Sequence, residues 1–193
     1  MKYRTVLLFG APGAGKGTQG KIIGNIPGFF HCASGDLFRN LPVDSSMGRL
    51  FLEYSSHGKL VPDEPTIELW RQFIEDITRQ GRFHPERDVL VLDGIPRNLR
   101  QAEMLRAVLD VRAVIYLHCA DFKKMVHRMQ TRALKENRLD DANLAVIRNR
   151  LKVYEKETKP VLNFYGRKLV HDVDSILSPV KVLARVLRVL DKI

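Results

Sequence analysis

The sequence predicts a three-layer α/β protein, in which a five-stranded parallel sheet is covered by helices on both faces. Strand-like and helix-like patterns alternate along the 193 residues, as they do where crossover helices join parallel strands. The first strand candidate, residues 5–9, is a short run rich in β-branched and aromatic residues that ends at Gly10, which is typical of a strand buried on both sides. The length suits one domain with one core, so any further unit has to be an insertion.

Each expected element follows from a local pattern. The strand at residues 5–9 ends at a glycine and is followed by helix signals over residues 16–25. Short β-branched or apolar runs bounded by polar and turn residues predict four more strands, at residues 29–33, 89–92, 111–118 and 169–173. The amphipathic stretch at residues 180–189 predicts a last helix that packs on the sheet.

The stretch between the second and third strands is too long for a simple crossover. Residues 34–81 have helical periodicity that prolines and a glycine interrupt. We expect a small helical insertion there that moves against the sheet. The core is then made of residues 1–33, 82–127 and 140–193.

The composition argues against several classes of protein. The chain has 32 Lys and Arg against 22 Asp and Glu, a formal charge of +10, but the basic residues are dispersed and form no tail. No apolar run approaches the ~20 residues of a membrane span, and the first run stops too early for a signal peptide. The two cysteines lack metal-ligand spacing and are too few for a disulfide scaffold. We therefore expect a cytoplasmic protein with no nucleic-acid and no membrane partner.

A phosphate-binding loop is predicted directly after the first strand. Residues 10–19 read Gly-Ala-Pro-Gly-Ala-Gly-Lys-Gly-Thr-Gln and open the first helix. Glycines let successive N–H groups point inward, and the helix N-terminus adds its partial positive charge to the same anion. Lys16 then reaches the outer phosphates, as in a P-loop. Gly17 follows the lysine and Thr18 comes one position late, which argues against direct magnesium ligation by a protein hydroxyl.

This shifted P-loop resembles that of the nucleoside monophosphate kinases, and of the adenylate kinase family in particular. Residues 33–39 resemble the monophosphate-site segment of that family, and residues 58–63 resemble the loop that touches the acceptor base. Residues 92–97, Leu-Asp-Gly-Ile-Pro-Arg, are similar to the Asp-Gly-Phe-Pro-Arg signature, with Gln101 at the family's spacing. The arginines that track the lid and the helix behind it are Arg128, Arg132, Arg138 and Arg150.

The resemblance implies a three-layer P-loop fold with a monophosphate-binding insertion at about residues 34–81 and a short lid at about residues 128–139. It also implies a monomer that transfers a phosphoryl group reversibly from MgATP to AMP, giving two ADP. Such a transfer needs cations and no base, because the acceptor oxygen is already an anion and the two nucleotides bring about four net negative charges together. Arginine suits this task, since its planar fork stays charged and grips two phosphate oxygens.

The family's functional residues carry over position by position. The resemblance implies that the catalytic cations are Lys16, Arg97, Arg132, Arg138 and Arg150. It implies that ATP is bound by Gly13, Ala14, Gly15, Lys16, Gly17, Thr18, Arg128 and Arg132, with Arg128 over the adenine. It implies that AMP is bound by Ser34, Arg39, Lys59, Leu60, Val61, Gly94, Ile95, Pro96, Arg97, Gln101, Arg138 and Arg150. Asp93, at the end of the third strand, is expected to hold Mg²⁺ through water.

Two positions bear on the choice of acceptor. Gln101 favours AMP, because a primary amide matches the donor and acceptor pair of adenine, whereas the pyrimidine relatives usually have Asn there. Ser34 stands where adenylate kinases usually have Thr and where CMP and UMP kinases often have a small residue. AMP is the preferred acceptor, and a UMP/CMP kinase is the alternative. A basic nucleic-acid-binding protein with a vestigial nucleotide fold is a second alternative, whereas a P-loop GTPase would need an Asn-Lys-x-Asp sequence that this chain lacks.

The lid region departs from the family pattern at several points. Asn137 replaces the glycine before Arg138, and residues 174–179 lack the glycine expected opposite Arg128. The short lid and the absence of cysteine from it argue against a zinc-binding insertion.

The helix behind the lid carries two candidate arginines. Arg150 lies one residue later than the family spacing, which leaves Arg148 as its rival and requires the extra residue to be absorbed near Ala142. We choose Arg150, because the residues after it keep the family's spacing. Asp140 and Asp141 are expected to support Arg132 and Arg138, although an aspartate at this place is also a good helix N-cap.

Overall fold

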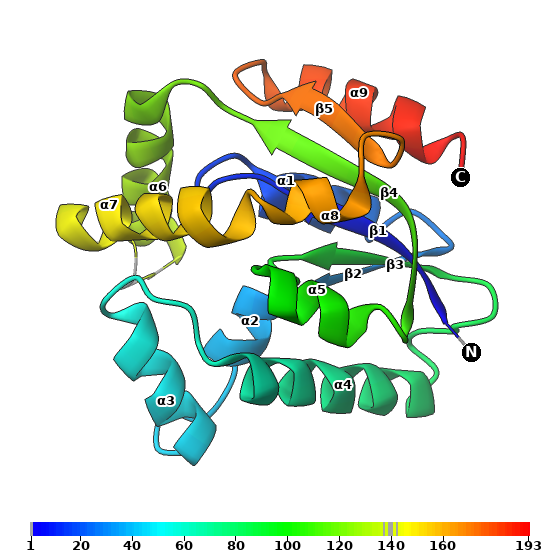
Figure 1. Ribbon diagram of the computed structural model, residues 1–193, viewed down its shortest axis with the longest axis horizontal. Coiled ribbons are helices and arrows are strands. Elements are labelled where there is room, and N and C mark those ends of the chain that lie inside the picture. Colours follow the sequence, from blue (N-terminus) through cyan, green and yellow to red (C-terminus); the bar gives the residue numbers. More distant parts are fainter. Residues whose placement is uncertain (1, 137, 139–140, 142) are drawn as a thin grey trace.

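The computed structural model describes residues 2–136, 138, 141 and 143–193. At its centre lies a parallel sheet with the strand order β2-β3-β1-β4-β5 (Figure 1). The strands are β1 (Tyr3–Phe9), β2 (Phe29–Ala33), β3 (Val89–Asp93), β4 (Leu109–His118) and β5 (Val170–Asp174). The predicted five-stranded parallel sheet is confirmed, and no strand end differs from its expected place by more than two residues.

Helices cover both faces of the sheet (Figure 1). One face is covered by α1 (Lys16–Ile23) and α9 (Pro179–Leu190), and the other by α4 (Asp63–Arg79), α5 (Leu99–Leu105) and α8 (Val161–Tyr165). The remaining elements are α2 (Ser34–Arg39), α3 (Ser46–Ser55), α6 (Phe122–Glu136), α7 (Leu144–Val153) and the π-helical turn η2 (Tyr154–Thr158). No helix in the described part of the chain is both long and apolar enough to cross a membrane.

The core explains why the second half of the first strand, residues 6–9, is apolar. Val6 and Leu8 of β1 pack in the cluster that α1 and α9 cover, whereas Leu7 and Phe9 pack in the cluster that α4 and α5 cover. All four side chains are at most 3% exposed. Since successive side chains of a strand point to opposite faces, a segment that is buried on both faces is apolar at successive positions.

The stretch expected as a helical insertion contains α2, α3 and α4. On α4, Trp70, Ile74 and Ile77 are almost fully buried in the core, so their helical spacing is that of a core face. In Figure 1, α3 lies apart from the sheet, beyond α2. Movement of this stretch against the sheet stays a prediction.

The strand order reverses around β1. The chain passes from β1 to β2 and β3 on one side and then crosses to β4 and β5 on the other. In such sheets the ligand crevice lies at the carboxyl ends of the strands, at this reversal. The segments that follow β1 and β3, which hold the phosphate loop and the residues after Asp93, meet there.

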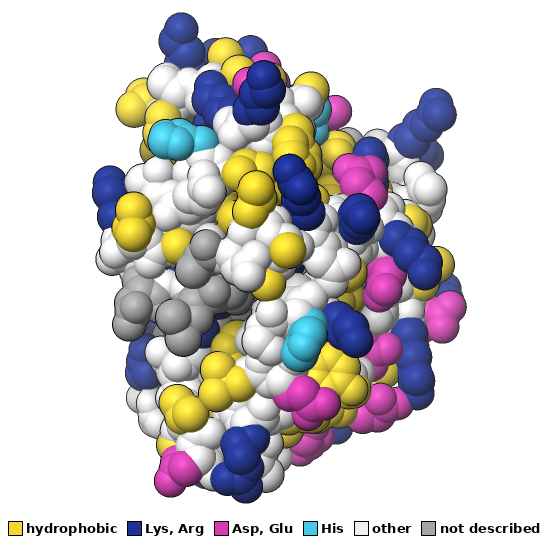
Figure 2. Space-filling model, turned by 90° about the vertical axis from the view of Figure 1, so that its left-hand side faces the viewer, with side chains coloured by type: hydrophobic (Ala, Val, Ile, Leu, Met, Phe, Trp, Pro, Cys, Tyr) yellow, Lys and Arg dark blue, Asp and Glu magenta, His cyan; other side chains and the backbone are white. Residues whose placement is uncertain are grey.

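The positive charge is distributed over the surface. On the face shown in Figure 2, Lys and Arg side chains are separated by polar, apolar and acidic ones. The dispersion expected from the sequence is thus seen on this face.

Candidate active site

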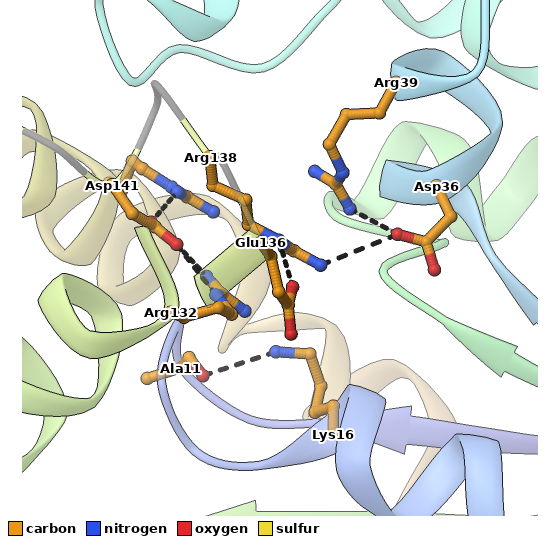
Figure 3. Close-up of polar contacts among 9 residues, drawn as sticks. Ala11, Lys16, Asp36, Arg39, Arg132, Glu136, Arg138 and Asp141 are labelled. Carbon is orange, nitrogen blue, oxygen red and sulfur yellow. Dashed lines mark hydrogen bonds and ion pairs between the residues drawn. The ribbon is translucent and has the colours of Figure 1, made fainter. Parts of the chain in front are cut away.

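The loop between β1 and α1 is curled tightly against α6. Gly13 has a φ of +83°, in the left-handed region, and a Cβ there would stand 2.8 Å from the carbonyl oxygen of Met125. The Lys16 ammonium folds back over the loop and donates to the carbonyl oxygen of Gly10 at 2.7 Å. It also donates to the carbonyl oxygen of Ala11 at 3.3 Å (Figure 3). The lysine is therefore held above the loop, where the outer phosphates of a bound nucleotide would lie.

The electrostatics of Lys16 show that other cations lie near it. Burial lowers the pKa of Lys16 to about 8; the Asp93 carboxylate opposes this shift, and the charges of Arg97, Arg132 and Arg150 add to it. These residues come from β3, the segment after it, α6 and α7. A site that gathers so much positive charge stabilises bound anions.

A cavity of about 480 Å³ opens at the carboxyl ends of β1 and β3. It brings together sequence-predicted residues from many segments: Gly13, Ala14, Gly15, Lys16, Gly17, Thr18, Ser34, Arg39, Lys59, Leu60, Val61, Asp93, Gly94, Pro96, Arg97, Gln101, Arg128, Arg132, Arg138 and Arg150.

Of the predicted site residues, Ile95 lies elsewhere. Its side chain is 1% exposed and belongs to the apolar core, whereas its neighbours Gly94 and Pro96 line the cavity. The Ile95 side chain therefore packs into the core and does not face the cavity, and the binding role expected for this residue stays a prediction.

Asp93 lies at the carboxyl end of β3, beside the phosphate loop. Its side chain lines the cavity, the residue is 9% exposed, and a Cβ on Gly17 would stand 3.8 Å from Oδ2. Within the described ranges, no group of three or more His, Cys, Asp or Glu side chains could hold a metal ion. A single carboxylate fits an ion such as Mg²⁺, which keeps several waters and takes few protein ligands.

One buried carboxylate holds two of the candidate arginines. Asp141 is 0% exposed, and its Oδ2 accepts from Arg132 Nε at 2.7 Å and Nη2 at 2.5 Å (Figure 3). Its Oδ1 accepts from Arg150 Nη1. The expected support of Arg132 by this acidic pair is therefore seen at Asp141, and Asp140 lies outside the described residues. Helix α7 is capped by Asn143, whose Oδ1 accepts from the Ala145 N–H at 2.7 Å.

A second carboxylate, Asp36, joins cations from two sides of the cavity. Its Oδ1 accepts from Arg39 Nη2 at 2.6 Å and lies 3.6 Å from Arg138 Nη2, and Arg138 Nε lies 2.6 Å from Glu136 (Figure 3). Burial tends to raise the pKa of Asp36, but the hydrogen bond and charge of Arg39 and the charge of Arg138 lower it overall. Sequence reasoning missed this contact, although Asp36 lies three residues before Arg39 on one helix, the spacing of neighbouring side chains.

The two candidate arginines of α7 are in different environments. Arg150 lines the cavity, whereas Arg148 is exposed and is not part of its wall. A Cβ on Gly58 would stand 2.9 Å from Arg150 Cγ, and Asn149 Nδ2 donates to the carbonyl oxygen of His57 at 2.6 Å. The choice of Arg150 therefore agrees with its position, and α7 contacts the loop before α4.

Two residues of the lid region lie outside the part of the chain that the structure describes. Asn137, in the place of the family's glycine, and Ala142, near which the extra residue was expected to be absorbed, lie outside the described residues. Residues 128–136 of the expected lid form the last part of α6.

The turn after β3 positions Arg97. Arg97 Nε donates to the Gly94 carbonyl oxygen at 2.7 Å, and Ser34 Oγ donates to the same oxygen at 2.6 Å. Gly94 has a φ of +76°, and a Cβ there would stand 2.8 Å from Ser34 Oγ. Thr158 Oγ1 donates to the Arg97 carbonyl oxygen at 2.6 Å, which links this turn to η2. The packing therefore requires glycine at position 94.

Arg128 lies against the opposite wall of the cavity. Its Nη2 donates to the Ser175 carbonyl oxygen at 2.9 Å, and its Nη1 lies 3.4 Å from the Gly13 carbonyl oxygen. Ser175 and Leu177 line the cavity in the segment that lacks the family's glycine. The wall beside Arg128 is thus formed by a backbone carbonyl and an apolar side chain.

An aromatic pair in the cavity wall gave no signal in the sequence. The rings of Phe38 and Phe51 are stacked, with centroids 5.2 Å apart and planes 11° from parallel, and both residues line the cavity. Phe38 is on α2 and Phe51 on α3, so the contact depends on how these helices pack.

Comparisons with known proteins agree with the geometry. A family model described as adenylate kinase matches residues 8–170. A protein named adenylate kinase from Kocuria rhizophila is 36% identical, over 97% of this chain and 98% of its own. Proteins of the same name from Thermobifida fusca and Porphyromonas gingivalis are 38% and 31% identical, over 89% and 97% of this chain and 89% and 95% of their own. With a phosphate loop, a cation-lined cavity and these matches over most of its length, the chain belongs to the adenylate kinase family.

Proposed function

We propose that the protein is a phosphotransferase that converts ATP and AMP reversibly to two ADP. The observation that carries this proposal is the convergence of Lys16, Arg97, Arg132, Arg138 and Arg150 on one cavity. The pKa of Lys16, lowered by burial and by three of these guanidinium groups, supports the same view, because it reports their closeness. Two nucleotides laid end to end supply the negative charge that such a site lacks.

The positions of the cations suggest how they divide the work. Lys16 and the loop N–H groups hold the ATP phosphates, and Arg39 and Arg97 hold the AMP phosphate. Arg132, Arg138 and Arg150 surround the phosphoryl group in transit and offset its charge. No base is needed, since the AMP phosphate is itself the nucleophile.

The carboxylate bridges keep these cations in place before nucleotides bind. Asp141 orients Arg132 and Arg150, and Asp36 orients Arg39 toward Arg138. A nucleotide phosphate then binds guanidinium groups that are already turned to the cavity, so less ordering is required on binding.

Asp93 is the residue that would hold Mg²⁺, through the water ligands of the ion. Its position beside the phosphate loop and the single-carboxylate donor set support this role. A bound ion would offset part of the negative charge of the phosphates.

Water has to be kept from the transferring group, because ATP would otherwise be hydrolysed. The hydrogen bond from Asn149 to His57 and the close packing of Gly58 on Arg150 support closure of the cavity on the AMP side. We further propose that the enzyme acts as a cytoplasmic monomer, since one chain supplies all the cations named.

The test is a set of initial rates at fixed MgATP with AMP, CMP, UMP and GMP as acceptors. We expect AMP to have the highest kcat/KM and the product to be ADP in a 2:1 ratio to ATP consumed. A higher kcat/KM with CMP or UMP would make the protein a pyrimidine nucleotide kinase, the interpretation that the small Ser34 side chain favours. No transfer to any acceptor would overturn the proposal.

A further inference from the structure

Among the described residues, the side-chain amide of Gln101 has two polar partners. Its Nε2 donates to Asp63 Oδ1 at 2.8 Å, and its Oε1 accepts from the Arg97 backbone N–H at 2.7 Å. The residue is 1% exposed and lines the cavity, whereas Asp63 is not part of the cavity wall. Asp63 thus acts on Gln101 from behind the binding surface.

The chemistry of these partners allows one orientation of the amide. A carboxylate only accepts hydrogen bonds, and a backbone N–H only donates them. Turning the amide by 180° would set its oxygen against the Asp63 carboxylate and its NH₂ against the Arg97 N–H. Both hydrogen bonds would become repulsive contacts in a buried place, where an unmade hydrogen bond is costly.

Asp63 is itself held by a second amide. Asn98 Nδ2 donates to Asp63 Oδ1 at 2.8 Å, and Asn98 Oδ1 accepts from the Gln101 backbone N–H at 2.8 Å. The carboxylate oxygen therefore receives two N–H groups from the start of α5 and is fixed in position relative to Gln101. This arrangement ties the N-terminus of α4 to that of α5.

The contacts within the described structure leave one lone pair on Oε1 and one N–H on Nε2 of the fixed amide for a ligand. Adenine offers a matching acceptor, N1, beside a donor, N6–H. A 6-oxopurine such as hypoxanthine has the reverse pattern, with a donor at N1 and an acceptor at O6. An amide free to turn would bind both bases, whereas an amide locked in one orientation binds only the base that its donor and acceptor match.

We propose that Asp63 is a positioning residue that locks the Gln101 amide and so makes the acceptor site select adenine over 6-oxopurine monophosphates. This inference rests on the proposed function, because it assumes that an acceptor base meets Gln101. Asp63 contacts no substrate in this scheme, and its whole effect on selectivity passes through Gln101.

The test compares kcat/KM for AMP with kcat/KM for inosine monophosphate in the wild type and in Asp63→Asn. The amide that this substitution introduces donates hydrogen bonds as well as accepting them. Turning Gln101 by 180° therefore costs one hydrogen bond in the variant, whereas it costs two in the wild type. We expect the AMP preference to fall by about tenfold, the effect of losing one charge-assisted hydrogen bond. The change in preference should come from KM, which should rise for AMP and fall for inosine monophosphate. The value of kcat should stay near that of the wild type.

The matched control is Glu64→Gln, the same chemical change at the next residue of α4. Glu64 pairs with Arg100 on the surface and has no contact with Gln101 in the described structure. It shares the first turn of α4 with Asp63, so a general loss of charge at this helix end would affect both variants alike. We expect Glu64→Gln to keep the wild-type preference.

A double-mutant cycle separates positioning from structure. Gln101→Leu removes the amide, so adding Asp63→Asn to it should leave the preference unchanged if Asp63 acts through Gln101. Asp63→Ala, checked for folding by circular dichroism, is the second variant and should reduce the preference at least as much as Asp63→Asn.

The outcomes distinguish the two proposals. Unchanged preference in both Asp63 variants, or an equal fall in the Glu64→Gln control, would overturn the positioning role and leave the proposed function standing. A wild type that transfers phosphate equally to AMP and inosine monophosphate would do the same. A wild type that transfers no phosphate to AMP would overturn the proposed function, and this inference with it.

Discussion

The guanidinium of Arg132 contacts the carboxylate of Asp141 through two nitrogens, with Nε 2.7 Å and Nη2 2.5 Å from Oδ2. Asp141 is fully buried and also accepts from Arg150, so one negative charge offsets two positive ones. A buried charge that loses its partner is strongly destabilising, because the remaining ion has neither water nor a counter-charge.

Asp141→Asn should therefore reduce the free energy of unfolding by about 3 kcal/mol in the absence of nucleotide. Urea denaturation measures this loss. The loss should shrink when ATP and AMP are present, since their phosphates offset the same two guanidinium groups. The control is Asp172→Asn, which removes an exposed ion pair with His118 and should cost less than about 1 kcal/mol. Equal stability of the two variants would contradict the role given to Asp141.

Lys16→Met should reduce kcat by at least about 100-fold and leave the fold intact, because it removes a cation held over the phosphate loop. Methionine keeps most of the apolar stem of lysine, so the packing of the loop should survive. Initial rates with MgATP and AMP measure the effect, and thermal unfolding checks the fold. A variant that keeps near wild-type turnover would contradict the interpretation of residues 10–19 as a loop that binds the ATP phosphates.

The affinity for ATP should fall as the pH rises above about 8. The pKa of Lys16 is lowered to about 8 by burial, so below that pH the free protein holds a protonated lysine ready to pair with phosphate. Above it the lysine is neutral, and phosphate binding requires the uptake of a proton, which weakens binding by up to about tenfold per pH unit. The phosphates themselves are fully ionised in this range.

Calorimetric titration with ATP from pH 7 to 9 in buffers of different ionisation enthalpy measures the affinity and the proton uptake. Lys16→Met should bind more weakly and show no such pH dependence. The same pKa predicts that the nucleotide-free protein gains stability from this residue between pH 8 and 10.5, since burial no longer opposes the charged form once the lysine is neutral. An affinity for ATP that stays constant up to pH 9 in the wild type would contradict the prediction.

Arg97→Ala should weaken the use of AMP far more than the binding of ATP. Arg97 sits on the turn after β3 and lines the cavity, and in the proposed division of work its loss removes a cation from the acceptor phosphate. We expect kcat/KM for AMP to fall by about 100-fold. The dissociation constant of ATP should change by less than about threefold. Arg100→Ala, at an exposed arginine three residues away, is the control. Equal losses for the two nucleotides would be inconsistent with this placement.

Arg150→Ala should abolish most activity, by about 100-fold or more, whereas Arg148→Ala should leave at least half of it. The two residues lie on one helix, but only Arg150 lines the cavity and contacts Asp141. Steady-state rates of both variants measure the difference. If Arg148→Ala were the damaging change, α7 would have to be rotated about its axis from the position described.

The sheet and the phosphate loop could be predicted because their signals are local. The apolar run of β1 reflects burial on both faces. The loop after it needs glycine at positions such as Gly13, where a Cβ would clash with a neighbouring backbone. The register of parallel strands then brings the ends of β1 and β3 to one place. Most of the cavity wall follows from these two facts and from the family's motifs.

The remaining features depend on how helices pack, which no local pattern encodes. A motif gives the place of Ile95 in the chain but not that its side chain turns into the core while Pro96 faces the cavity. Arg148 and Arg150 are about 200° apart around a helix axis, so the start of α7 decides which one faces the site. The bridge from Asp36 to Arg138 and the contact between Asp63 and Gln101 join residues far apart in sequence.

Helix α6 limits how the donor site can be redesigned. It carries Met125, whose backbone oxygen lies under Gly13, and one turn apart it also carries Arg128 and Arg132. Any substitution that shifts or rotates this helix therefore displaces Met125, Arg128 and Arg132 together. The contacts of these residues with Gly13, Ser175 and Asp141 would change at the same time. A protein engineer who wants a different donor base should therefore leave α6 untouched and vary Leu177, which borders the same space from an independent segment.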